Sequence, residues 1–380
     1  MKQIGRLKVG IIFGGRSGEH EVSLMSTQSV LAELDAEQYS VYQIGIDHDG
    51  RWYTGDRTLA AMLEGDIKSL SRATLLPDPV NQGLFEIRED IKGEFIHQIS
   101  GLDVVFPVLH GSYGEDGALQ GLLELADISY VGAGVLGSAL AMDKGVFKDI
   151  MRANNIPVPE SIVVLRRDIE GQLDIVIQTA ENLFPYPIFT KPANLGSSVG
   201  ISKCQNRYDL QEGLFEAARY DRRILIERGI NAREIEVSVL GNDSPEVSIP
   251  GEIIPSREYY SYEAKYIDGR SELLIPAPLP DEATQKIQEL AIKAYKLIDC
   301  AGMARVDFLL EKDNQQLTQP GELYLSEINT IPGFTKISMY PKLWEASGIT
   351  FPDLINRLID LALERKLDKS RNEHRFQGVE

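Results

Sequence analysis

Apolar residues in the first part of the chain form short runs that alternate with amphipathic segments. Runs of apolar side chains cover residues 9–13, 39–46 and 104–109, and two glycines close the first of them. Residues 22–34 and 119–125 instead place apolar side chains at helical spacing. Strands that alternate with helices predict a doubly wound parallel sheet.

The pattern changes beyond this region. A helix is predicted over residues 142–154, before Pro157 and Pro159, and an amphipathic helix over residues 351–364. Between them lie a predicted helix at 169–182 and predicted strands at 161–165, 188–191, 224–227, 235–240, 248–254, 303–310 and 322–327. Residues 256–271 form a polar, aromatic segment that is too long for a simple connector, which favours a functional loop.

Composition and charge exclude several classes of protein. The 380 residues allow two or three domains, and the net charge of −18 argues against a nucleic-acid binder. Two cysteines, Cys204 and Cys300, are too few for a disulfide framework and indicate a reducing compartment. No apolar stretch reaches the ~18 residues of a membrane span. We therefore expect a cytoplasmic protein that does not act at a membrane.

A glycine-rich turn follows the first predicted strand and carries one acidic residue, Glu19. A strand, a glycine turn and a helix form the usual arrangement for a ligand at a helix N-terminus, but residues 14–19 are not a G-x-G-x-x-G motif. A carboxylate here would repel a pyrophosphate and attract an ammonium group. The alternative is an ordinary first-turn acid that is stabilised by the helix dipole.

Lys191 ends a predicted strand, and a Gly/Ser loop follows it up to Gly200. Backbone N–H groups and hydroxyls of such a loop can surround a phosphate while the lysine supplies charge. This is not a P-loop, because the lysine precedes the glycines. A flexible linker is the alternative.

Two short segments alternate polar and apolar residues near the end of the chain. Period two places Arg305 and Asp307 on one face of a strand, and Glu327 and Asn329 on one face of the next. Two carboxylates and an amide are hard oxygen ligands that suit Mg²⁺ or Mn²⁺ carried in with substrate phosphates. The alternative is a surface salt-bridge cluster across a hairpin.

Three further positions carry weaker signals. Lys144 near a helix start, taken alone, favours a solvated lysine, and Glu227–Arg228 at a strand end could face an adenine. His110 ends a strand where α/β proteins bind ligands, but a structural histidine is as plausible there.

In this order, the motifs resemble the ATP-grasp superfamily and, within it, the D-alanine–D-alanine ligases. The resemblance covers residues 9–363 and is carried by residues 14–23, 109–117, 191–200, 263–266, 305–307 and 327–333. It implies an α/β and α+β architecture, the ATP-grasp fold with an N-terminal Rossmann-like domain. The expected domains are residues 1–135, 136–228 and 229–380, with residues 256–271 as a lid.

The same resemblance implies a site for ATP, two Mg²⁺ or Mn²⁺ ions and two D-alanines. The nucleotide would contact Lys144, Lys191, Ser197, Ser198, Glu227, Arg228, Ile230 and Glu234. The metal ligands would be Asp307, Glu327 and Asn329. Substrate would contact Glu19, His110, Lys265 and Ser338. Catalysis would use Glu19, Ser197, Tyr266, Arg305 and Gly333.

The implied reaction joins two D-alanines through an acylphosphate for peptidoglycan precursor synthesis, in a homodimer, with a potassium requirement left open. A D-alanine–D-lactate ligase is the nearest rival, and Tyr266 in the lid favours the dipeptide. An NAD-dependent oxidoreductase conflicts with the absent G-x-G-x-x-G motif. A non-catalytic nucleotide-binding module conflicts with the carboxylates and Arg305.

Overall fold

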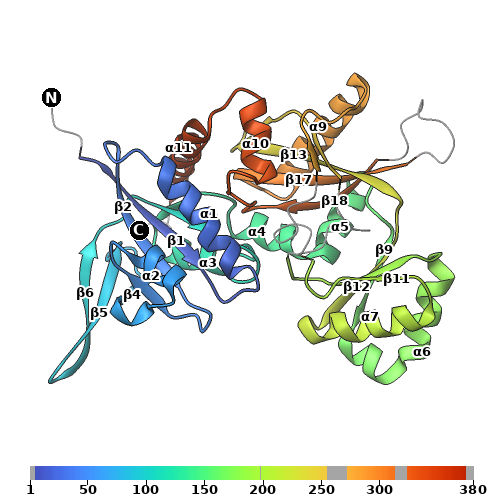
Figure 1. Ribbon diagram of the computed structural model, residues 1–380, viewed down its shortest axis with the longest axis horizontal. Coiled ribbons are helices and arrows are strands. Elements are labelled where there is room, and N and C mark those ends of the chain that lie inside the picture. Colours follow the sequence, from blue (N-terminus) through green and yellow to red (C-terminus); the bar gives the residue numbers. More distant parts are fainter. Residues whose placement is uncertain (1–4, 197, 255–271, 313–322, 374–380) are drawn as a thin grey trace, which may run out of the picture.

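The computed structural model describes residues 5–196, 198–254, 272–312 and 323–373, and they build three sheets (Figure 1). The first sheet has eight strands in the order β6-β5-β4-β3-β2-β1-β7-β8. Its strands are β1 (Leu7–Gly14), β2 (Tyr39–Ile46), β3 (Trp52–Thr54), β4 (Ser71–Leu75), β5 (Leu84–Asp90), β6 (Gly93–Ser100), β7 (Val104–Val108) and β8 (Ser129–Tyr130). Its helices are α1 (His20–Glu33), α2 (Thr58–Glu64), the 3-10 helix η1 (Ile67–Ser69) and α3 (Ala118–Leu125).

The prediction of a doubly wound parallel sheet is wrong for half of this sheet. Strand β1 pairs in parallel with β2 and β7, and β7 with β8, but the ladder from β2 to β6 is antiparallel. The parallel part holds the continuous apolar runs: Val9, Ile11 and Phe13 are fully buried. The antiparallel part was not predicted, because most of β6 is solvent-exposed and lacks the apolar pattern of a buried strand.

The second sheet has four strands in the order β11-β10-β12-β9 and is covered by two helices (Figure 1). Its elements are β9 (Ser161–Leu165), α6 (Arg166–Leu183), β10 (Ile188–Pro192), β11 (Ser202–Cys204), α7 (Arg207–Tyr220) and β12 (Arg223–Arg228). Helices α4 (Val135–Met142) and α5 (Lys144–Ala153) precede it. The single helix predicted from residue 142 is therefore wrong at its start: Asp143 leaves helical geometry and accepts hydrogen bonds from Gly145 and Val146, capping α5.

The third sheet has six strands in the order β16-β15-β13-β17-β18, with β14 paired to β13. Its elements are β13 (Ala232–Gly241), β14 (Glu246–Val247), β15 (Gly251–Ile254), β16 (Glu272–Leu274), β17 (Gly302–Glu311) and β18 (Leu323–Asn329). Helices α9 (Asp281–Leu297) and α10 (Met339–Ala346) pack beside it and were not predicted. The strand predicted at 248–254 begins only at Gly251, after Pro250.

Helix α11 (Phe351–Lys369) joins the third sheet to the first. Its Leu354 and Leu358 pack in one cluster with Val9 and Phe106 of the first sheet. Lys366 forms an ion pair with Asp127 at the edge of that sheet. The end of the described chain thus contacts its beginning. No described helix is long and apolar enough to span a bilayer.

Candidate active site

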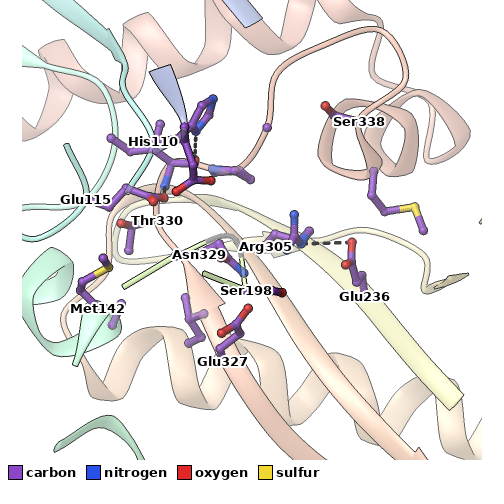
Figure 2. Close-up of a pocket in the computed structure, with 18 of the residues that line it drawn as sticks. His110, Glu115, Met142, Ser198, Glu236, Arg305, Glu327, Asn329, Thr330 and Ser338 are labelled. Carbon is purple, nitrogen blue, oxygen red and sulfur yellow. Dashed lines mark hydrogen bonds and ion pairs between the residues drawn. The ribbon is translucent and has the colours of Figure 1, made fainter. Parts of the chain in front are cut away.

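A cleft opens between the first and third sheets, and its lining includes every predicted substrate-binding and catalytic residue that the structure describes. Glu19, His110, Arg305, Gly333 and Ser338 all line it. Figure 2 shows His110 and Ser338 on opposite sides, with Arg305 and Glu327 on the strands between them. The predicted residues Ser197, Lys265 and Tyr266, and the lid at 256–271, lie outside the described residues.

Glu19 lies at the start of α1, and its carboxylate is bordered by Gly111 and Gly196, two glycines from other loops. It is 8% exposed, and its carboxylate makes no capping hydrogen bond with the helix. A Cβ atom on Gly111 would lie 2.6 Å from its Oε2, and one on Gly196 would lie 2.7 Å from the same oxygen. Glycines therefore give this carboxylate its room, and its contacts lie toward the cleft loops rather than along α1.

His110 and Glu115, in the loop after β7, hold the backbone of Ile331 from two sides. The Nδ1 atom of His110 lies 2.9 Å from the Ile331 carbonyl oxygen, so it is the donor. The Ile331 N–H donates to Oε1 of Glu115 at 3.1 Å, and the Gly111 N–H donates to Oε2 at 2.7 Å. The loop of the first sheet thereby fixes the loop that carries Gly333.

Burial shifts the pKa of both side chains that hold Ile331, His110 and Glu115. Burial lowers the pKa of His110, although nearby Glu19 opposes the shift, so the imidazole is neutral near pH 7. Burial and the negative charge of Glu19 raise the pKa of Glu115 to about 8. Glu115 therefore titrates close to physiological pH, within the lining of the cleft.

Three carboxylates form a row across the third sheet. Glu236 on β13 pairs with Asp307 on β17, and Asp307 pairs with Glu327 on β18. Direct cross-strand partners share a face, and adjacent like charges destabilise a sheet unless they are neutralised. Arg305 supplies the opposite charge: it forms a bidentate pair with Asp307 at 2.7 Å and lies 3.0 Å from Glu236.

Asn329 completes the metal set predicted from strand alternation. It is the cross-strand partner of Arg305, and its Nδ2 donates to Asp307 at 3.0 Å. Strand pairing therefore brings Asp307, Glu327 and Asn329 to one face, as the sequence predicted.

A second cleft lies between the second and third sheets. Its lining includes every described residue of the predicted nucleotide set: Lys144, Lys191, Ser198, Glu227, Arg228, Ile230 and Glu234. Asp307 and Glu327 line it as well, and Lys144, Ser198, Glu236 and Glu327 belong to both clefts. The two clefts therefore meet at the row of carboxylates.

The lysines of this second cleft are held in defined positions. Lys144 donates to the Leu195 carbonyl oxygen at 2.6 Å and lies 4.0 Å from Glu327. Lys191 lies 2.5 Å from Glu227, whose other oxygen is 2.8 Å from Lys148. Burial alone would raise the pKa of Glu227, but the two lysines hold it at about 2.

Comparison with known proteins identifies the family of this chain. The family model described as D-ala D-ala ligase N-terminus matches residues 8–133, and D-ala D-ala ligase C-terminus matches residues 150–360. The D-alanine–D-alanine ligase of Thermoanaerobacter sp. is 50% identical over 366 residues, covering 96% of this chain and 98% of the relative. The chain belongs to the D-alanine–D-alanine ligase family.

Solved structures of the family share its fold. The D-alanine–D-alanine ligase of Coxiella burnetii is 37% identical, with a TM-score of 0.77 and 96% of each chain covered. The VanG D-Ala:D-Ser ligase of Enterococcus faecalis is 34% identical, with a TM-score of 0.81, covering 94% of this chain and all of that one. The chain is therefore an enzyme of the ligase class, and the predicted ATP-grasp fold with an N-terminal domain is confirmed.

Sequence reasoning missed three residues of the site. Glu236 lies two positions after Glu234 on a strand, so period two could have placed it on the same face. Glu115 lies in the same short segment as His110, but the sequence gives no sign of its contact with Ile331. Lys148 follows Lys144 by one helical turn and reads as a solvated lysine, although it is 2% exposed.

Proposed function

We propose that this enzyme joins two D-alanines to D-alanyl-D-alanine at the expense of ATP, forming ADP and phosphate, for peptidoglycan precursor synthesis. The observation that carries the proposal is the meeting of the two clefts. One has the buried carboxylate Glu19, which suits an amino-acid ammonium group, and the other has Lys144 and Lys191, which suit phosphates. A carboxylate and a γ-phosphate that bind in the two clefts would meet beside Glu327.

The first step would be attack of a D-alanine carboxylate oxygen on the γ-phosphorus. ADP leaves, and an acylphosphate forms. Glu19 would hold the ammonium group of this D-alanine, and Lys144 and Lys191 would neutralise phosphate charge, the main protein contribution to phosphoryl transfer. A site built around an ammonium group rejects analogues that lack one.

The second step would be attack of the second D-alanine's amine on the acyl carbon, with loss of phosphate and one proton. Arg305 and the Gly333 N–H would stabilise the oxyanion of the tetrahedral intermediate. Both line the cleft. A side chain at position 333 would place its Cβ 2.9 Å from Ser338 Oγ, so glycine keeps this backbone open. Ser338 would bind the second carboxylate.

Asp307, Glu327 and Asn329 would hold the magnesium or manganese ions. Their donor set fits, because carboxylate and amide oxygens on adjacent strands suit hard divalent cations. Among the described residues, no three His, Cys, Asp or Glu side chains cluster as a metal site, so such ions would also need phosphate or water ligands. A bound metal would neutralise charge during phosphoryl transfer.

Several features of the proposal rest on the sequence or on the family resemblance, and not on the described structure. These are the lid with Lys265 and Tyr266, the contacts of Ser197, the two-metal stoichiometry, a potassium requirement, the homodimer and a cytoplasmic location. They stay predictions.

The decisive test is phosphate release from ATP by the purified chain, with mass spectrometry of the product. Phosphate release that needs both Mg²⁺ and D-alanine, with D-alanyl-D-alanine as the product, is the expected result. L-Alanine is the matched control and should support little turnover. D-Lactate and D-serine, each added with D-alanine, report on the rival products. Failure of D-alanine to stimulate phosphate release would overturn the proposal.

A further inference from the structure

Lys148 is a buried lysine on α5, one turn beyond Lys144. Its side chain is 2% exposed, and its ammonium group lies 2.8 Å from Oε2 of Glu227. The ammonium group of Lys191 lies 2.5 Å from Oε1 of the same carboxylate. One buried carboxylate therefore joins two ammonium groups, one from α5 and one from β10.

The two lysines differ in their access to the nucleotide cleft. Lys191 lines this cleft together with Glu227, and its side chain is 16% exposed. Burial lowers the pKa of Lys148, and the positive charge of Lys191 adds to this effect. The pKa of Lys191 is instead raised, because the attraction of Glu227 outweighs its burial. The one negative charge of Glu227 cannot neutralise two ammonium groups. Lys148 is the more buried of the two lysines, and its charged form is the less stabilised.

A phosphate that binds Lys191 would change this balance. The ammonium group of Lys191 would have to turn from Glu227 toward the phosphate, exchanging one anion for another. A carboxylate that stays buried without a partner is strongly destabilising. Lys148 would then remain as the cation in contact with Glu227.

We infer that Lys148 is a positioning residue that acts through Glu227: it keeps this carboxylate charged and in place when Lys191 turns to the phosphates of the nucleotide. The inference rests on the proposed function, because it assumes that the second cleft binds ATP. Lys148 itself contacts the carboxylate and not the nucleotide. Its removal should therefore weaken nucleotide binding and leave the chemistry of bound substrates nearly unchanged.

The charged groups near Glu227 determine how nucleotide binding is coupled to proton uptake by this carboxylate. Lys148 and Lys191 are the charged groups in contact with it, while its cross-strand partners are the uncharged Phe189 and Ser161. Farther out, Glu327 and Glu234 act on Lys191, and Arg152 acts on Lys148. In Lys148→Met, nucleotide binding would remove the remaining partner of Glu227, and the buried carboxylate would take up a proton.

The experiment is calorimetric titration of the full chain with ADP and Mg²⁺ in two buffers of different ionisation enthalpy. Lys148→Met should weaken ADP binding at neutral pH by about tenfold or more and add proton uptake that the wild type lacks. The deficit should shrink at lower pH. Steady-state kinetics should show a raised KM for ATP with kcat nearly unchanged. Lys148→Arg should restore much of the affinity.

Lys293→Met is the matched control. Lys293 lies on α9, is exposed, and donates to the Asn154 carbonyl oxygen, so its loss should change neither affinity nor proton uptake. Unchanged ADP affinity and proton uptake in Lys148→Met would refute the inference. Absence of ADP binding by the wild type would count instead against the proposed function.

A second variant covers the case in which Lys148→Met does not fold. In Lys148→Met/Glu227→Gln, the neutral amide needs no buried counter-charge, so the protein should fold, and position 227 can no longer take up a proton. If this double variant also shows no cooperative transition in a thermal scan, it is not folded. Lys148 then serves only the packing of α5, and the inference is wrong.

Discussion

Replacement of Gly111 by alanine should impair the first-substrate site far more than it impairs the fold. Gly111 has φ of +74°, and an added Cβ would lie 2.6 Å from Glu19 Oε2 and 2.9 Å from Ser17 Oγ. Ordinary contacts begin at 3.4 Å, so the Glu19 carboxylate would have to move by about 0.8 Å. Gly196 borders the same oxygen, since a Cβ atom built on it would lie 2.7 Å away, and this limits where the carboxylate can go.

Stability and activity should respond by different amounts. A left-handed backbone costs a residue with a Cβ about 1–2 kcal/mol. The clash itself adds little, because it falls on the ends of two side chains that can shift. A displacement of roughly 1 Å in a positioning group can cost about 100-fold in rate. We therefore expect kcat/KM for D-alanine to fall about 100-fold, with KM for ATP nearly unchanged.

Gly65→Ala separates the two effects. Gly65 has φ of +73°, almost identical to Gly111, but nothing lies within 4 Å of its Cβ position. Urea denaturation should give both variants a similar loss of stability, and phosphate release should be impaired in Gly111→Ala alone. If the two variants agree in kcat/KM to within about threefold, the carboxylate of Glu19 is not confined as described.

Three other substitutions test the remaining parts of the site. Glu327→Gln should abolish phosphate release across a magnesium titration while its thermal unfolding stays close to wild type; near-normal turnover at millimolar magnesium would remove Glu327 from the metal set. Glu19→Gln should raise KM for the first D-alanine or lower kcat by more than about tenfold with ADP binding intact; unchanged kinetics would return Glu19 to the role of a helix-dipole acid. The pKa of Glu115 is raised to about 8 in the folded chain, so its neutral form favours folding at low pH and this contribution is lost as pH rises toward 8. Between pH 5 and pH 8, wild type should therefore lose more stability in urea than Glu115→Gln, and parallel losses would show that Glu115 is not the titrating group.

The sequence predicted those parts of the fold in which each strand carries its own signal. Residues 9–13 are apolar without interruption because the β1 strand is buried on both faces, and residues 305–307 alternate because one face of β17 meets the cleft. Helix α9 also had a signal, since Ile287, Leu290, Ala291 and Ala294 recur at helical spacing and are buried. The sequence therefore carries enough signal to predict this helix.

The limits of prediction are clearer at the site. Lys148 looks like an exposed helical lysine, because local pattern does not reveal that the β12 strand brings Glu227 against it. Glu115 likewise acquires its pKa from Glu19 and from burial, both of which depend on the folded arrangement. Strand alternation could place Asp307 and Asn329 on chosen faces, but it could not reveal that Arg305 bridges Asp307 and Glu236.

The contact between α11 and the first sheet has a consequence for the order in which the chain can fold. One face of that sheet, with Val9 and Phe106, is completed by Leu354 and Leu358 from the far end of the described chain. The ribosome therefore synthesises Glu19 and the strands of the first sheet long before it synthesises α11, which packs on that sheet. Until α11 is made, this apolar face has only part of its native cover, with Leu24 and Val30 of α1 packed on it, so the core of the first sheet is completed only when α11 docks.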